Sequence, residues 1–107
     1  MAIVGATETQ VLDLNVDGAA VYFLTRGVVA FTAQGELVSG TWATAVVTLE
    51  RSNDKRNWYG LESAVSWTGE DMTDQTDACF EWFRARVSTV EGGAGVIEVT
   101  VHLLRDA

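Results

Sequence analysis

Two side chains in this sequence could supply a nucleophile or a base: the single cysteine, Cys79, and the single histidine, His102. A thiol becomes a nucleophile when a base activates it at close range. The two residues fall on different predicted strands, so we interpret Cys79 as a small buried residue and His102 as a surface or interface residue. A zinc site needs several such ligands. We therefore predict no catalytic residue, no metal ligand and no enzymatic activity.

Carboxylates are densest between residues 68 and 77, a segment that contains Glu70, Asp71, Asp74 and Asp77. Clusters of oxygen ligands favour Ca²⁺, but this spacing is not that of an EF-hand loop. We interpret residues 68–77 as a polar, solvated loop, and we expect the protein to use no cofactor.

The charge balance excludes two classes of partner. The 107 residues include 15 acidic and 7 basic side chains, which give a formal net charge of −8. Binding to nucleic acid or to an anionic membrane requires concentrated lysine and arginine. The N-terminal residues lack the basic region and apolar stretch of a signal peptide, so we expect none, and no apolar run reaches membrane-spanning length. With one cysteine, folding cannot depend on an internal disulfide, so we expect synthesis and folding in a cytosol.

A hairpin dominates the middle of the chain. Residues 41–51 alternate, with Ala43, Ala45, Val47 and Leu49 on one face and Trp42 on the other. Alternation with a period of two is typical of a half-buried strand. Residues 52–56, Ser-Asn-Asp-Lys-Arg, are turn formers. The chain then resumes with Trp58 and Tyr59 as the second strand of the hairpin.

The remaining segments also read as short strands separated by turns. Strands are predicted over residues 8–16, 19–25, 28–33, 63–67, 78–89 and 96–105. The strands at 78–89 and 96–105 are joined by Glu-Gly-Gly-Ala-Gly, and we expect them to pair directly as a hairpin. Their inward faces should form core, from residues Phe83, Ala85, Val87, Ile97, Val99, Val101 and Leu103.

These segments predict an all-β fold. We expect a single antiparallel β-sandwich, jelly-roll-like or immunoglobulin-like, of about eight strands. The sandwich should span residues 8–107, after an N-terminal arm of residues 1–7. The sequence contains no proline, a residue that often blunts edge strands, so edges must be protected by charge or covered by partners.

Candidate contact residues fall in two places. Ile3 and Val4 give the arm an apolar character that suits docking onto a neighbour. At the hairpin, loop tips often carry binding contacts, and exposed aromatic residues anchor interfaces or stack on sugars. The candidate interface residues are therefore Ile3, Val4, Asp54, Lys55, Arg56, Trp58 and Tyr59.

The stretch from Gly40 to Val101 resembles small virion structural proteins of tailed bacteriophages. The shared elements are Gly-Thr-Trp at 40–42, Ser-Asn-Asp and Asn-Trp within 52–58, the turn Thr-Gly-Glu-Asp-Met-Thr-Asp at 68–74, and Phe-Arg-Ala-Arg-Val-Ser-Thr-Val-Glu-Gly at 83–92. The resemblance implies a sandwich exposed on a virion, made in the host cytoplasm. A capsid decoration (cement) protein or a head–tail accessory protein is expected. Its partners would be the major capsid protein and copies of itself, with a trimer as the expected homo-oligomer.

An alternative function stays open. The Ser-Asn-Asp…Trp hairpin is also similar to one in discoidin-type sandwiches that bind carbohydrate or lipid, although Lys55 stands where those modules often have glycine. A carbohydrate-binding module or a tail-associated adhesin would use the exposed tryptophan and tyrosine rings.

Overall fold

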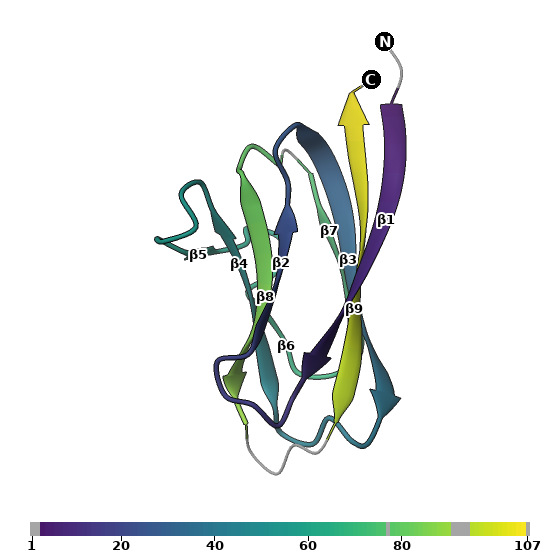
Figure 1. Cartoon of the computed structure of the whole chain (residues 1–107), viewed down its shortest axis with the longest axis vertical. Helices are drawn as coiled ribbons and strands as arrows, with labels where there is room; N and C mark the ends of the chain where they lie inside the picture. Colours follow the sequence, from purple (N-terminus) through teal and green to yellow (C-terminus); the bar gives the residue numbers. More distant parts are fainter. Residues whose placement is uncertain (1–2, 77, 91–94, 107) are drawn as a thin grey trace.

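The computed structural model describes residues 3–76, 78–90 and 95–106, which form two antiparallel β-sheets packed face to face (Figure 1). Sheet A has the strand order β1 (Ile3–Asp13), β9 (Val96–Asp106), β3 (Val28–Ser39) and β7 (Asp71–Gln75). Sheet B has the order β2 (Ala20–Leu24), β8 (Trp82–Thr89), β4 (Val46–Ser52) and β5 (Tyr59–Gly60), and β6 (Ser66–Trp67) also pairs with β4. The all-β sandwich is confirmed, with nine strands in these ranges. None of the described residues belongs to a helix long and apolar enough to cross a membrane.

Successive strands mostly lie in opposite sheets. The chain passes from β1 in sheet A to β2 in sheet B, returns to β3 in sheet A, and crosses again to β4. Glycines with positive φ stand at the first two crossings, Gly18 at 80° and Gly27 at 77°. Glycine adopts this left-handed backbone without the steric cost of a Cβ. The loops therefore carry the chain across the sandwich. Within the described residues, β4 and β5 are the only consecutive strands that pair as a hairpin.

The predicted hairpin between residues 78–89 and 96–105 is wrong. β8 pairs with β2 and β4 in sheet B, whereas β9 pairs with β1 and β3 in sheet A. Both strands do turn their apolar faces inward, because the two sheets of a sandwich share one core. Four residues of the expected turn, 91–94, lie outside the described residues.

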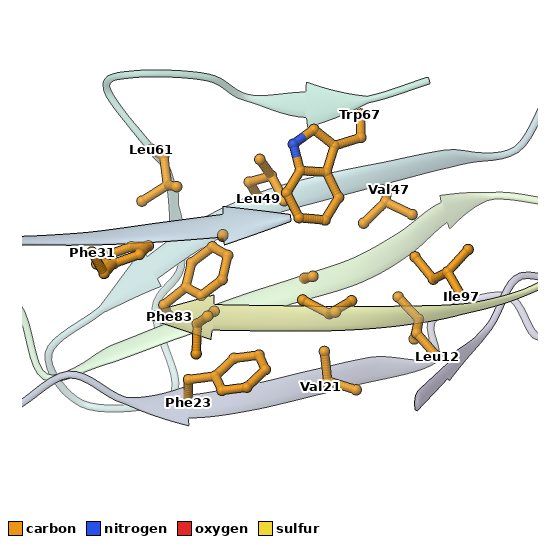
Figure 2. Close-up of a cluster of buried hydrophobic side chains, with 14 of the residues drawn as sticks. Leu12, Val21, Phe23, Phe31, Val47, Leu49, Leu61, Trp67, Phe83 and Ile97 are labelled. Atoms are coloured by element: carbon orange, nitrogen blue, oxygen red, sulfur yellow. The ribbon is translucent and has the colours of Figure 1, made fainter. Parts of the chain in front are cut away.

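The core lies between the sheets and contains every core residue predicted from the last two long strands (Figure 2). Its centre is a group of phenylalanine rings, with Phe31 and Phe83 at 5.1 Å and Phe23 and Phe83 at 5.9 Å between ring centroids. Aromatic pairs at this separation contribute beyond the area that they bury. The residues from β8 and β9 are fully buried: Phe83, Ala85, Val87, Ile97, Val99, Val101 and Leu103.

Two tryptophans belong to this core. The indole of Trp67 is buried and donates to the Thr73 hydroxyl at 2.9 Å. Trp42 was predicted to face away from Ala45, and this is wrong, because both residues are buried. β4 begins only at Val46, and the positive φ of Ala43, 51°, breaks the alternation before it. The Trp42 indole donates to the Ala45 carbonyl at 2.9 Å.

Two predicted irregular segments are strands. Residues 3–7, assigned to an arm, belong to β1 and pair with β9 from Ile3↔Asp106 onward, so the arm prediction is wrong there. Met1 and Ala2 lie outside the described residues. The polar loop predicted over 68–77 contains β7, which pairs with β3. The N-terminal end of β1 and the C-terminal end of β9 reach beyond the strands of sheet B (Figure 1).

Candidate functional site

The hairpin tip between β4 and β5 is held by one carboxylate. Asp54 Oδ1 accepts the backbone N–H groups of Asn57 at 2.8 Å and Arg56 at 2.9 Å, and Oδ2 accepts the Asn57 side chain at 2.7 Å. Ser52 Oγ accepts the backbone N–H of Lys55 at 2.8 Å. The N–H bonds, from Asn57 first and then Arg56, hold the pKa of Asp54 far below its ordinary value of 3.8. These hydrogen bonds therefore hold the tip in a defined conformation.

Two side chains of this hairpin, Lys55 and Trp58, pack against residues on the outer face of sheet B. The Lys55 ammonium lies 4.3 Å from the ring centroid of Trp82 and 5.0 Å from that of Tyr22. The Arg84 guanidinium lies 4.1 Å from the ring centroid of Trp58, which in turn lies 5.7 Å from Tyr22. Cations over aromatic faces attract the ring quadrupole. We call these residues the aromatic–cationic cluster: Tyr22, Lys55, Trp58, Trp82 and Arg84.

An ion-pair network fixes the next part of the same face. Glu50 Oε1 accepts from Arg84 Nε at 2.9 Å and from Arg86 Nε at 3.0 Å. The Glu50 side chain is only 12% exposed. Burial raises the pKa of Glu50, but the hydrogen bonds and charges of Arg86 and Arg84 outweigh burial, so the pKa lies below its ordinary 4.5. Arg84 thus bridges the network to Trp58.

The structure brings together part of the predicted interface. Lys55 and Trp58 both lie against Tyr22, Asp54 holds the tip, and Arg56 is exposed beside it. Tyr59 is 65% exposed on β5. The arm residues of the prediction, Ile3 and Val4, lie in sheet A on the other side of the molecule (Figure 1).

Sequence reasoning missed three members of the cluster. Tyr22, Trp82 and Arg84 alternate with buried Phe23 and Phe83, so their outward direction is readable from the sequence. Their proximity is not readable, because it depends on β2 pairing with β8 in the register Tyr22↔Arg84.

The candidate chemical residues lie apart. Cys79 is exposed, contrary to the prediction that it is buried. It borders a groove of about 270 Å³ with Tyr59 and Phe80, and a second of about 200 Å³ with Arg26. His102 lies on the outer face of sheet A, with Nδ1 3.0 Å from the Thr7 hydroxyl. Cys79 lies in the loop between β7 and β8, whereas His102 lies on β9.

The acidic segment has structural contacts. Glu70 accepts the backbone N–H of Leu37 at 3.0 Å, and Asp71 accepts that of Met72 at 2.8 Å. Asp74 is exposed on β7, and Asp77 lies outside the described residues. Within the described ranges, no group of three or more histidine, cysteine, aspartate or glutamate residues is placed to hold a metal ion.

Charge divides between the two sheets. The strands of sheet A carry one basic residue, Arg105, and the acidic residues Glu8, Asp13, Glu36, Asp71, Asp74, Glu98 and Asp106. The strands of sheet B and the tip carry two acidic residues, Glu50 and Asp54, and the basic residues Arg51, Lys55, Arg56, Arg84 and Arg86. The aromatic–cationic cluster therefore lies on the positive side of an acidic protein.

No protein-family model matches the sequence, and no curated protein matches it. The fold is similar to the crystal structure of the SPBc2 prophage-derived protein YomS, with a TM-score of 0.70. The similarity covers 94% of this chain and 95% of that chain at 10% sequence identity. The two chains therefore share a fold over nearly their whole lengths.

Proposed function

We propose that this protein is a structural component of a bacteriophage virion, and that it binds the assembled head as a decoration protein. The aromatic–cationic cluster on sheet B carries this proposal. Tryptophan, tyrosine and arginine dominate the residues that contribute most to protein–protein binding. The full-length likeness to a prophage-derived protein and the phage-type strand pattern of residues 40–101 support the virion setting.

The geometry of the cluster favours a protein over a sugar. A sugar stacks on an open ring face, whereas Lys55 already lies over the ring of Trp82 and Arg84 over that of Trp58. The cluster is instead a mixed surface of ring edges and partly neutralised cations. Its excess positive charge suits an acidic patch on the major capsid protein, and such complementarity speeds and orients association.

The proposed action is mechanical, without catalysis. A protein that binds only the assembled head stabilises the assembled state by mass action. The tip is already held by Asp54, with its Oδ1 bound to two backbone N–H groups. Ordering this surface on binding therefore costs little entropy, which favours affinity. Heads without the protein should assemble but lose their genome at lower temperature or under osmotic shock.

Co-sedimentation with heads purified without the protein tests this proposal. Wild-type protein should pellet with heads, and Trp58→Ala should lower the affinity at least about tenfold, the loss typical of a hot-spot truncation. Met72→Ala is the matched control, because Met72 is 58% exposed but lies on sheet A. Salt should weaken binding of the wild type, since the attraction is partly between charges.

Two results would contradict this proposal. If wild-type protein never pellets with heads but binds tails or host polysaccharide, the decoration role fails and a tail-associated adhesin takes its place. If Trp58→Ala and Met72→Ala bind heads as well as the wild type, the cluster is not the docking surface.

A further inference from the structure

The outer edge of β1 is open. β1 ends the strand order of sheet A and pairs with β9 alone among the described strands. It is 11 residues long and contains neither proline nor lysine. Such an edge presents a row of unpaired backbone N–H and C=O groups, and natural proteins usually shorten, charge or cover it. An edge of this length is a template for another strand.

The side chains of β1 are unusually apolar for a solvated edge. Ile3 is 55% exposed, Val4 52% and Val11 63%. Ile3, Thr7 and Val11 are on one face, because side chains alternate along a strand. On that face Thr7 is 3.0 Å from His102. The His102 imidazole lies across Gly5, where an added Cβ would be 2.8 Å from two ring atoms.

One antiparallel register makes β1 complementary to itself. With Thr7 opposite Thr7 of a second copy, Ile3 lies opposite Val11, and the symmetry repeats this apolar pair at the other end. Val4 then lies opposite Gln10 on the inner face. Apolar and β-branched cross-strand pairs stabilise antiparallel strands. Centring the pair on Glu8 would instead place two glutamates opposite each other, which is unfavourable.

We propose that two copies of this protein pair through their β1 strands, antiparallel and with Thr7 at the two-fold axis, and so join two four-stranded sheets into one continuous sheet. The proposal does not rest on the proposed function, because the dimer forms without a head. An antiparallel pair of identical strands is isologous, the arrangement of the commonest oligomers. The proposed dimer is an alternative to the trimer that the resemblance implies.

Molar mass in solution is the first test. Wild-type protein should show twice the chain mass of 11.6 kDa by light scattering, and Val11→Lys should reduce it to that of one chain, because a lysine on an edge opposes strand pairing. Val65→Lys is the matched control, since Val65 is 64% exposed but lies outside β1. Circular dichroism should show both variants folded. Wild-type protein that stays monomeric at its highest soluble concentration would overturn the proposal.

Disulfide trapping tests the register. In a Cys79→Ser background, Thr7→Cys should form a covalent dimer with oxidised glutathione, because directly opposed residues on antiparallel strands have the Cα spacing of a disulfide. Thr9→Cys is on the same face, but its counterpart in the second copy is four residues away along the partner strand, so it should stay uncrosslinked. Equal crosslinking at both positions, or none at Thr7, would refute the proposed pairing.

Discussion

The indole of Trp67 lies directly over the backbone of Gly35, and a Cβ added to Gly35 would stand 2.9 Å from ring atoms Cε3 and Cζ3. The two residues come from opposite sheets, Gly35 from β3 and Trp67 from β6. Trp67 is also held by the bond from its indole N–H to Thr73 on β7, the neighbour of β3 in sheet A. The missing side chain of Gly35 is therefore what lets the Trp67 indole fit between the sheets.

Gly35→Ala should destabilise the protein by about 1–3 kcal/mol, the usual cost of overpacking a core. The ring cannot move away without losing its hydrogen bond to Thr73. Chemical denaturation measures the change. Gly69→Ala is the control, because a Cβ there meets nothing within 4 Å, and its stability should be near that of the wild type. A Gly35→Ala variant with wild-type stability would show that Trp67 is free to shift.

Val99→Asp should abolish folding at room temperature. Val99 is fully buried on β9, and an unpaired carboxylate buried there costs several kcal/mol, a large fraction of the stability of a domain of this size. Far-ultraviolet circular dichroism and gel filtration report the loss. Val65→Asp, at an exposed position, should fold normally. A folded Val99→Asp protein would mean that the inward face of β9 has been misassigned.

Asp54→Ala should loosen the tip while leaving the sandwich folded. Arg56 and Asn57 lose the acceptor of their backbone N–H groups, so their amide hydrogens should exchange faster by nuclear magnetic resonance. Asp13→Ala is the matched control, because Asp13 Oδ1 accepts the backbone N–H of Asn15 at 2.8 Å in a similar turn elsewhere. Unchanged exchange at Arg56 and Asn57 would contradict the role of Asp54.

The same carboxylate predicts a pH dependence at the tip. The pKa of Asp54 is lowered below its ordinary 3.8, so its stabilising effect is complete above that value and is lost only as the pH falls through the lower, folded value. Carboxyl-carbon titration should therefore show Asp54 still ionised at a pH where free aspartate is half protonated. A midpoint at or above 3.8 would refute the hydrogen-bonded geometry.

Glu50→Gln should destabilise the protein by about 2 kcal/mol at neutral pH, because it leaves two half-buried arginines short of a charged acceptor. The pKa of Glu50 is lowered below 4.5, so its contribution is full above that value and fades as the pH falls further. The melting temperatures of wild type and variant should therefore converge in acid. Glu62→Gln, whose side chain is 74% exposed, should melt like the wild type at every pH.

Sequence alternation was enough to predict which residues of β8 and β9 face inward, because apolar side chains at every second position can bury only one face. It could not predict which strands are neighbours. Phe83 and Val99 lie in different sheets, yet both satisfy the pattern expected of a hairpin. Adjacency in a sandwich depends on long-range packing, which local periodicity does not record.

β7 was missed because its pattern is inverted. Thr73 and Gln75 are buried while Met72 is 58% exposed, so the segment Asp-Met-Thr-Asp-Gln reads as a polar loop. The buried polar groups are satisfied by the Trp67 indole and by Ser63, whose hydroxyl bonds to Gln75 Oε1 at 3.0 Å. Burial of these residues follows from tertiary hydrogen bonds that no local rule contains.

The sequence predicted the residues at the hairpin tip, but it did not predict the residues from distant strands that contact them. Turn chemistry identified the tip and its residues Asp54 and Lys55. The partners of Lys55, Tyr22 and Trp82, come from strands far away in the sequence. Lys55 also has a positive φ of 62°, a backbone conformation that is uncommon for lysine and that its residue type does not predict.

The passage of the chain from sheet to sheet has a consequence for how the protein folds. Apart from β4 and β5, no two described strands that are consecutive in the sequence pair with each other, and β1 pairs with β9, at the far end of the described chain. Pairings between distant segments must overcome loop-closure entropy before any contact stabilises them, so such topologies fold slowly. Among the described strands, the short β4–β5 hairpin is the most local pairing, so it can form early. During synthesis β1 has no sheet to join until β9 leaves the ribosome, and its apolar edge is exposed for that whole interval.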